Sequence, residues 1–176
     1  MKTLLACIVL VCAAFASDEP SVRLAKAACG PDKARFGVKA HKGQPPAPQP
    51  QPGKALVYVV EEFVRPANEL GKPTIRVGVD GSWVGANRST SYLFFAVDPG
   101  EHHLCTDWQA APPWYGPKVS LASFKAEADG IYYFRARVVM DGSRGAMLTL
   151  DLEQMDKDEG RLLVASAPLS EYKQKK

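Results

Sequence analysis

The sequence predicts an all-β protein, either an antiparallel β-sandwich or a partly open barrel, with one short C-terminal helix. Three observations support this expectation. Short runs of alternating apolar and polar residues follow one another closely, Gly-containing turn dipeptides separate most of them, and helical features occur only near the C-terminus. Many short strands at close spacing are typical of sandwiches and barrels, whose sheets bury one face each.

Eight strands are expected, and the first begins after Lys54. Side chains alternate between the two faces of a strand, so Ile75, Val77 and Val79 should face a core while Arg76 points away from it. The expected strands are residues 55–63, 74–79, 83–86, 91–97, 101–108, 119–126, 131–140 and 146–152.

Tight turns are expected where glycine permits a positive φ angle. Asp80-Gly81 and Asp129-Gly130 suit two-residue hairpins, and Pro99-Gly100 fits the two central positions of a type II turn. Residues 141–145 should form a longer hairpin loop.

A short helix is expected after the last strand. Asp156, Asp158 and Glu159 would lie in its first turn, where carboxylates interact favourably with the positive end of the helix dipole, and Leu162 follows on an apolar face. Gly160 lowers the helix propensity of this segment.

The N-terminus has the features of a signal peptide. Lys2 precedes an apolar run over residues 4–15, and Ala14-Phe15-Ala16 has the small-x-small pattern of a cleavage site, so residues 1–16 should be removed on export. This run is shorter than the about 20 apolar residues that span a bilayer, and no later run is longer, so the mature chain should have no transmembrane segment. A lipid anchor on Cys7 is an alternative, but almost no hydrophobic region precedes that cysteine. We expect a periplasmic or extracellular protein.

Cleavage would leave two cysteines, Cys29 and Cys105, in an oxidising compartment. A disulfide between them is the expected state. Closing so long a loop stabilises the fold by roughly 4 kcal/mol in the chain-entropy description. A redox-active pair is the alternative, but the sequence lacks the Cys-x-x-Cys spacing that tunes reactive thiols.

The mature chain divides by composition into four parts. An N-terminal segment, residues 17–43, carries Cys29, and a proline-rich spacer follows over residues 44–53. The β domain spans residues 54–170, and a basic tail, residues 171–176, ends the chain. The spacer should be an extended polyproline helix; a ligand for a proline-recognising domain is the alternative.

Charge and residue types limit the function classes. The net charge of +3 and the scattered basic residues do not indicate a nucleic-acid partner. Among the three histidines, His103 shares a strand face with Cys105, but a disulfide-bonded cysteine cannot ligate a metal, so neither a metal nor another cofactor is expected. The carboxylates at Glu61-Glu62 and residues 156–159 are interpreted as solvated charge, and no residue is predicted to be catalytic.

Aromatic side chains are the candidate ligand-binding residues. Trp108, Trp114 and Tyr115 lie in or beside a proline-rich loop, and Trp83 follows the Asp80-Gly81 turn. Exposed rings of this kind bind sugars, peptides or other proteins; the alternative is that they fold over the open end of the sandwich. Asn87-Arg88-Ser89 matches a glycosylation acceptor and is interpreted as a polar turn between two strands.

Several segments resemble an uncharacterised bacterial family of exported proteins, known as domain of unknown function 2846. The resemblance lies in residues 53–59, the hairpin over residues 79–85, Tyr92, Pro99-Gly100-Glu101-His102 and residues 130–134. The hairpin is also similar to small β modules named for a Pro-Glu-Gly-Ala motif, although His102 stands in the alanine position. The resemblance covers about residues 53–170 and implies an exported β-rich protein, but it transfers no functional residue.

These observations favour an exported, non-enzymatic binding or structural module of the bacterial cell envelope, with an unidentified envelope protein or glycan as partner. An envelope hydrolase acting on carbohydrate or peptide is the alternative. It would need a pocket that gathers distant carboxylates or His102.

Overall fold

The computed structural model describes residues 28–31, 33–42, 45, 48, 51–63, 74–109, 119–141 and 147–175. The predicted signal peptide, residues 1–16, lies outside this part of the chain, as do Trp114 and Tyr115. The predicted spacer over residues 44–53 and the hairpin loop over residues 141–145 are described only in part.

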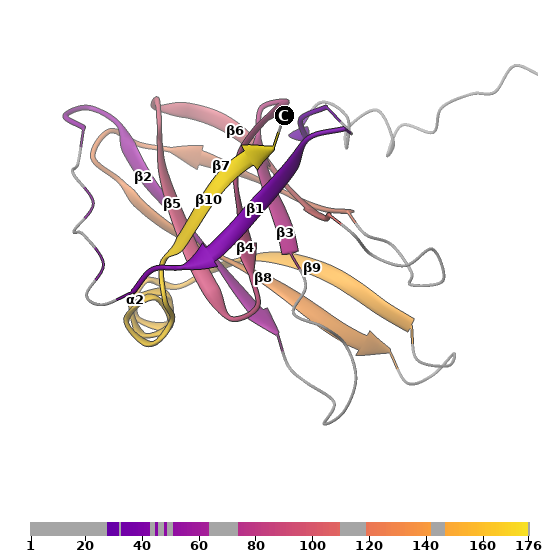
Figure 1. The fold of residues 1–176 in the computed structure, drawn as a ribbon. Helices are drawn as coiled ribbons and strands as arrows, with labels where there is room; N and C mark the ends of the chain where they lie inside the picture. The colour runs from indigo at the N-terminus through magenta and orange to yellow at the C-terminus, as the bar shows by residue number, and fades with distance from the viewer. Residues whose placement is uncertain are drawn as a thin grey trace, which may run out of the picture.

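The described residues form a β-sandwich, as the sequence predicts (Figure 1). One sheet has the strand order β5-β2-β8-β9 and the other β4-β3-β6-β7, and a two-stranded ribbon pairs β1 with β10. The strands are β1 (Arg35–Ala40), β2 (Ala55–Phe63), β3 (Thr74–Val79), β4 (Ser82–Arg88), β5 (Ser91–Val97), β6 (Gly100–Trp108), β7 (Val119–Ala126), β8 (Ile131–Asp141), β9 (Met147–Met155) and β10 (Ser170–Lys175).

Two features of the sheets position the later sites. β4 and β5 follow each other in the chain and join the two sheets along one side, whereas β7 lies beside β9 along the other. β2 pairs with β8 in parallel, from Leu56 opposite Ile131 to Phe63 opposite Val138, while the other strand pairs are antiparallel. The first sheet is therefore mixed, which differs from the purely antiparallel arrangement that we expected.

The core lies between the two four-stranded sheets. Ile75 and Val77 are fully buried there, and Val79 packs against the same cluster, which confirms the predicted alternation. The rings of Phe124 and Phe134 meet edge to face across the sheets, with centroids 5.1 Å apart. Apolar side chains from both sheets make up most of this interior.

The β1–β10 ribbon forms a third layer on the outer face of β4. Phe36 and Val38 pack against Ala86, and the ring of Phe36 contacts that of Tyr172. The expectation of a basic tail over residues 171–176 was wrong, because residues 171–175 belong to β10 and pair with β1. Both ends of the described chain therefore cover the outer face of the second sheet at β4.

Tight turns connect the strands as the glycine pattern predicts. Asp80 and Gly81 both have positive φ angles, 49° and 80°, between β3 and β4. Asp129 also has a positive φ, 60°, and Gly100 has a φ of 144° at the start of β6. Within the described part of the chain, none of the helical segments combines the length and apolarity needed to cross a membrane.

The C-terminal helix, α2 (Lys157–Ser166), packs on the outer face of the first sheet. Asp156 caps its N-terminus by accepting hydrogen bonds from the backbone amides of Asp158 and Glu159 at 2.9 and 3.0 Å. Gly160 is the buried residue of the helix and lies directly against the ring of Tyr133. The glycine that weakens the helix in sequence terms is therefore the residue that lets the helix approach the sheet.

We predict that Gly160→Ala destabilises the protein. Alanine has a higher helix propensity than glycine by about 1 kcal/mol, but a Cβ at this position would overlap the Tyr133 ring. Overpacking of this kind costs about 1–3 kcal/mol, so the free energy of unfolding should fall in urea or thermal denaturation. Leu162→Ala is the matched control, because Leu162 is 69% exposed on the same helix and should change stability by less than about 0.5 kcal/mol. A more stable Gly160→Ala variant would contradict the close packing.

Candidate functional site

The two cysteines that remain after the predicted cleavage are joined in the structure. Cys29 and Cys105 form a disulfide with their Cα atoms 5.1 Å apart, within the usual range for such bonds. Cys105 is on β6 and is fully buried, and Ala28 and Trp83 pack around the bridge. The disulfide therefore fastens the N-terminal segment to the outer face of the second sheet.

Trp83, one of the predicted ligand-binding residues, packs against this N-terminal segment. Its Nε1 donates a hydrogen bond to the carbonyl of Pro31 at 2.9 Å, and the guanidinium carbon of Arg76 lies 4.4 Å from its ring centroid. Arg76 also pairs with Asp107 and donates to the carbonyl of Ala34 at 2.8 Å. One edge and one face of the Trp83 ring are thus occupied by the chain itself.

The other predicted aromatic residues are in two situations. Trp108 is at the end of β6 and is buried in the main core, so the alternative of burial describes this ring. Trp114 and Tyr115 lie outside the described residues, and their role stays a prediction. The structure brings Trp83 together with Cys29 and Cys105, but it places Trp108 on the opposite face of the sheet from them.

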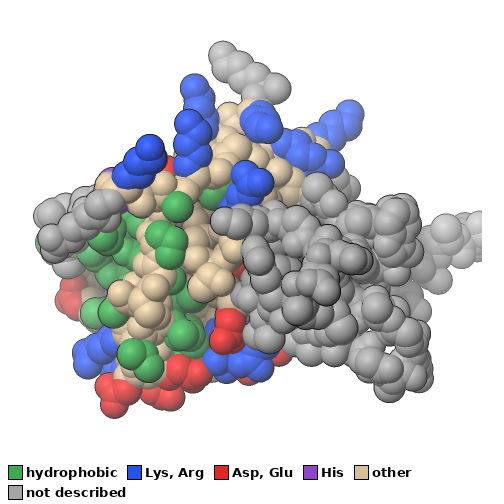
Figure 2. Space-filling view, turned by 60° about the horizontal axis from the view of Figure 1, so that its bottom comes forward, with side chains coloured by type: hydrophobic (Ala, Val, Ile, Leu, Met, Phe, Trp, Pro, Cys, Tyr) green, Lys and Arg blue, Asp and Glu red, His purple; other side chains and the backbone are tan. Residues whose placement is uncertain are grey.

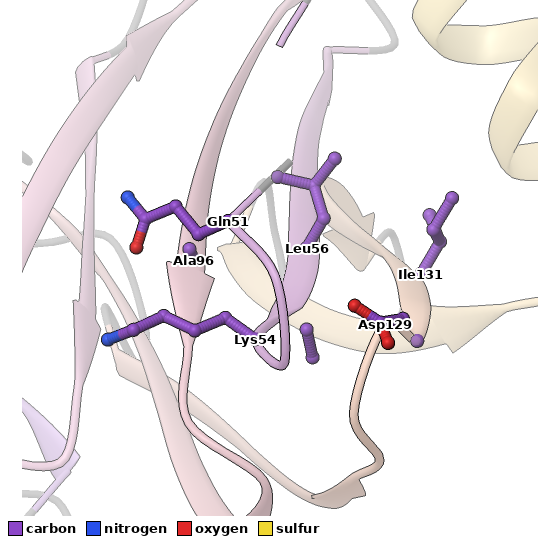
Figure 3. Close-up of a pocket in the computed structure, with 8 residues that line it drawn as sticks. Gln51, Lys54, Leu56, Ala96, Asp129 and Ile131 are labelled. Atoms are coloured by element: carbon purple, nitrogen blue, oxygen red, sulfur yellow. The ribbon is translucent and has the colours of Figure 1, made fainter. Parts of the chain in front are cut away.

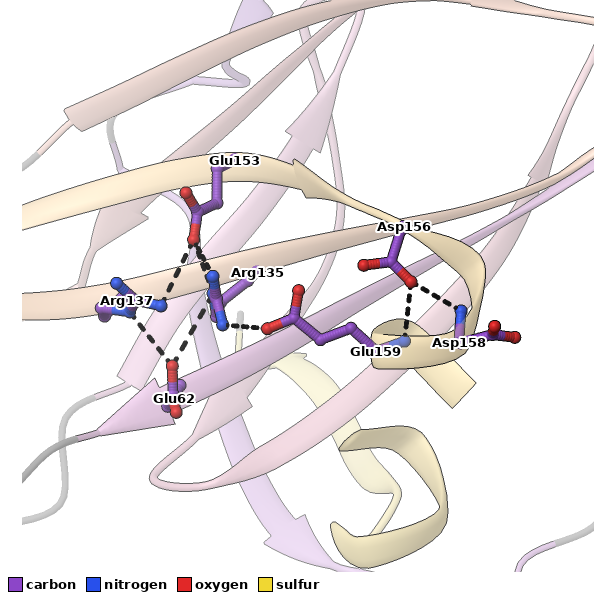
Figure 4. Close-up of polar contacts among 7 residues, drawn as sticks. All are labelled: Glu62, Arg135, Arg137, Glu153, Asp156, Asp158 and Glu159. Carbon is purple, nitrogen blue, oxygen red and sulfur yellow. Dashed lines mark hydrogen bonds and ion pairs between the residues drawn. The ribbon is translucent and has the colours of Figure 1, made fainter. Parts of the chain in front are cut away.

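The predicted solvated acids at the C-terminal helix are partly engaged in an ion-pair network on the outer face of the first sheet (Figure 4). Arg135 is its centre: Nη1 donates to Glu159 at 2.6 Å, Nε donates to Glu153 at 2.7 Å, and Nε lies 3.7 Å from Glu62. Arg137 lies 3.1 Å from Glu62 and 3.4 Å from Glu153. The network links β2, β8, β9 and α2, and carboxylates held in this way act as structural partners.

Glu61 and Glu62 are neighbours on β2 and point to opposite faces. Glu62 joins the outer network, but Glu61 points inward, is fully buried and has no hydrogen-bond partner for either carboxylate oxygen. The interpretation as solvated charge was wrong for Glu61. Burial without a hydrogen-bond partner raises the pKa of Glu61 well above its usual range. The side chain is therefore a neutral acid at moderate pH.

Asn87 is a second buried polar residue near the same end of the sandwich. Its Nδ2 donates to the carbonyl of Val59 at 2.9 Å, and its Oδ1 has no partner. The expectation that Asn87 lies in a polar turn was wrong, because β4 continues through Arg88 and the side chain of Asn87 is fully buried. Its amide instead ties β4 to β2 across the sandwich.

His102 bridges two turns through both ring nitrogens. Nδ1 lies 2.6 Å from Oδ2 of Asp80, and Nε2 lies 2.7 Å from the carbonyl oxygen of Asp98. Both partners only accept hydrogen bonds, so this geometry requires a doubly protonated imidazolium. Partial burial lowers the pKa of His102, but the hydrogen bonds and negative charges of Asp80 and Asp98 outweigh it, and the net shift is upward.

The ring of the neighbouring His103 forms no bridge of this kind with any described residue, and Cys105 on the same strand face offers it no free thiol. His103 is exposed on the opposite face of β6, where its backbone amide donates to Oδ1 of Asp80 at 2.9 Å. Cys105, which shares a face with His103, is in the disulfide. Within the described ranges, no group of three or more His, Cys, Asp or Glu side chains lies close enough to hold a metal ion.

A small surface pocket lies at the opposite end of β2 from Glu61 (Figure 3). Its volume is about 120 Å³, well below the roughly 300–1,000 Å³ of typical ligand pockets. Its polar side chains are used locally: Asp129 accepts from the Gly53 amide at 3.0 Å, and Lys54 lies 3.1 Å from Asp98. The lining residues are Gln51, Lys54, Ala55, Leu56, Ala96, Asp129, Gly130 and Ile131.

Comparison with known proteins gives no match: no family model, no curated protein and no solved structure is significantly similar to this chain. The resemblance to the family of unknown function therefore stays a prediction. Glu61, Asn87 and the His102 bridge were missed at the level of sequence, although alternation along β2 places Glu61 and Glu62 on opposite faces.

We predict that Glu61→Gln stabilises the protein at neutral pH. The pKa of Glu61 is higher in the folded state than in the unfolded state, where it is 4.5. Glu61 therefore does not lower the free energy of unfolding below about pH 4.5, but it lowers it increasingly as the pH rises towards the folded-state pKa. Glutamine removes this ionisation, and the free energy of unfolding at pH 7 should rise by about 1–3 kcal/mol. Denaturation of both proteins between pH 4 and pH 8 measures the effect.

Glu62→Gln is the control for this experiment. It makes the same chemical change on the neighbouring residue, but it weakens the ion pairs with Arg135 and Arg137 and should not stabilise the protein. Parallel stability curves for Glu61→Gln and the parent across this pH range would show that Glu61 is not a buried neutral acid.

We also predict a pH-dependent effect of His102→Gln. The folded-state pKa of His102 is raised above 6.5, so its stabilising contribution is complete below about pH 6.5 and is lost as the pH rises through the folded value. The variant should be less stable than the parent by about 1 kcal/mol at pH 5.5, and the difference should shrink at high pH. His103→Gln, one residue away, is the matched control, because it leaves both contacts of the His102 ring in place. A difference that grows with pH would contradict the imidazolium bridge.

Proposed function

We propose that this protein is a non-enzymatic binding or structural module, exported to the bacterial cell envelope, whose partner is an envelope protein or a glycan. The observation that carries this proposal is the filled interior of the sandwich. Phe134, Ile75, Leu93 and Leu104 are among the fully buried side chains that occupy it. A β-sandwich of this kind presents its variable surface at the rims and outer faces, where binding proteins make their contacts.

The polar groups of the described residues support the same proposal. The outer carboxylates pair with Arg135 and Arg137, and the pocket near Lys54 is small and has its charged groups, Lys54 and Asp129, engaged. These arrangements stabilise structure, and they present no pair of converging acids to a substrate. The disulfide between Cys29 and Cys105 is compatible with an oxidising compartment outside the cytoplasm.

The hydrolase alternative has one observation in its favour, the raised pKa of Glu61. A neutral carboxylic acid at moderate pH can act as a general acid, and such shifts are frequent in active sites. However, a general acid must reach the substrate, and Glu61 is fully buried in the described structure. Its burial favours a role in the interior, and Glu61→Gln separates the two functions.

We predict that the purified mature protein binds isolated envelope material without degrading it. The protein should co-sediment with the insoluble envelope fraction, and no soluble sugar or peptide should be released over the same period. Mass spectrometry of the exported protein should find the N-terminus at Ser17. Glu61→Gln is the matched variant, and it should bind as the parent does, because Glu61 is buried.

Two results would change the assignment. Release of soluble fragments by the parent and its loss in a folded Glu61→Gln variant would establish the hydrolase alternative. Failure of the folded parent to sediment with any envelope fraction would contradict the binding function. A Trp114→Ala, Tyr115→Ala double variant tests the predicted aromatic site separately, because unchanged sedimentation would exclude that loop as the contact.

A further inference from the structure

The outer face of the β1–β10 ribbon is basic. Arg35 and Lys39 on β1 and Lys173 and Lys175 on β10 are exposed, and the register places Arg35 opposite Lys175. The alternate residues of β1 point the other way and pack on the sandwich. Side chains of alternate strand residues share a face, so these four cations lie together on the side that faces away from the protein.

The lysines of this face have no anionic partner among the described residues, and Glu171, the acid on the same face, is paired with His41 at 2.6 Å. Elsewhere in the described structure, Lys54, Arg76, Arg135 and Arg137 all pair with carboxylates. In the space-filling view, Lys and Arg side chains gather along the upper edge of the molecule and Asp and Glu along the lower edge (Figure 2). Lys39, Lys173 and Lys175 thus carry positive charge that no described carboxylate pairs with, on a protein whose net charge is only +3.

The spacing of these cations fits an extended anionic chain. Residues two apart on a strand are separated by roughly 6.5–7 Å, and paired strands lie about 4.8 Å apart. Lys173 and Lys175 therefore form a short row, with Lys39 and Arg35 alongside it on β1. Lys173 and Lys175 are neighbours on one face of β10 with no acid between them, so an anion bound along this row would reduce the repulsion between the two ammonium groups.

We propose that this face, which we call the ribbon face, binds an anionic polysaccharide of the cell envelope, through acidic groups spaced along an extended glycan. The proposal rests on the proposed binding function and names the class of its ligand. A lipid surface fits less well, because Gly37 lies between the cations of β1 and the outward positions supply no apolar side chain for insertion. Lysines on strand edges also discourage aggregation, a role that needs no ligand.

The test compares two double variants that remove the same charge. Lys173→Ala with Lys175→Ala removes two lysines of the ribbon face, and Lys125→Ala with Lys157→Ala removes two exposed lysines elsewhere. Binding to alginate, a polymer of uronic acids, is measured at several salt concentrations by titration. Neutral dextran and vesicles containing anionic lipid are the comparison ligands. Circular dichroism and gel filtration check that each variant is folded and monodisperse.

We expect the parent to bind alginate in preference to dextran and vesicles, with an affinity that falls as salt rises. The ribbon-face variant should bind about tenfold more weakly or worse and depend less on salt, because it makes fewer ionic contacts. The control variant should bind within about twofold of the parent. Equal losses in both variants would show that only net charge matters, and would overturn the proposal.

Other outcomes also decide against it. Stronger binding to anionic vesicles than to alginate would assign the ribbon face to a membrane, and aggregation of the variant without loss of affinity would assign its lysines to edge protection. Loss of alginate binding in the Trp114→Ala, Tyr115→Ala variant alone would place the site on that loop. If the parent protein sediments with envelope material but does not bind alginate, it has the proposed binding function with a different ligand. If the parent protein binds neither alginate nor envelope material, the proposed binding function is itself wrong.

Discussion

Strands β3 and β4 of the second sheet are buried on both faces over much of their length, and the rest of the structure depends on this constraint. The inner face of this sheet packs on the other sheet, and its outer face at these strands is covered by residues 28–40 and β10. Small residues make the close approach possible: a Cβ on Gly78 would lie 3.2 Å from the carbonyl oxygen of Ala28, and one on Gly85 would lie 2.7 Å from the Tyr172 ring. The disulfide keeps the N-terminal segment in place, so the ribbon can present its other face outward.

Local signals explain how much of this fold could be predicted. Residues 55–63, 74–79 and 119–126 are strands with the predicted bounds, because their alternation and turn residues act within a few positions. β1 and β10 were not predicted, because β1 buries its apolar side chains only by packing on β4, and the inward positions of β10 include a single large apolar residue, Tyr172. In β1, Phe36 and Val38 alternate with polar residues, a signal too short to separate from a loop.

Less of the candidate sites than of the fold could be predicted from the sequence. Alternation places Glu61 and Glu62 on opposite faces, but it cannot tell which of them meets Arg135 and which meets the apolar interior. That difference is set by β8 and by β4, which are distant in sequence. The same holds for His102, since its charge state follows from two acceptors brought together by separate turns. Residue type indicated candidates here, whereas tertiary contacts decided their chemistry.

The distribution of paired and unpaired charges supports the proposed recognition surface on the ribbon. Apolar packing accounts for the interior, α2 and the Arg135 network cover part of the first sheet, and residues 28–40 cover part of the second. On the ribbon face, Lys39, Lys173 and Lys175 stand close together without a carboxylate partner among the described residues. Because the ribbon joins the two ends of the described chain, an anion bound across both strands would also strengthen their pairing. Ligand binding and the pairing of the two ribbon strands would then stabilise each other, since the bound anion contacts both β1 and β10.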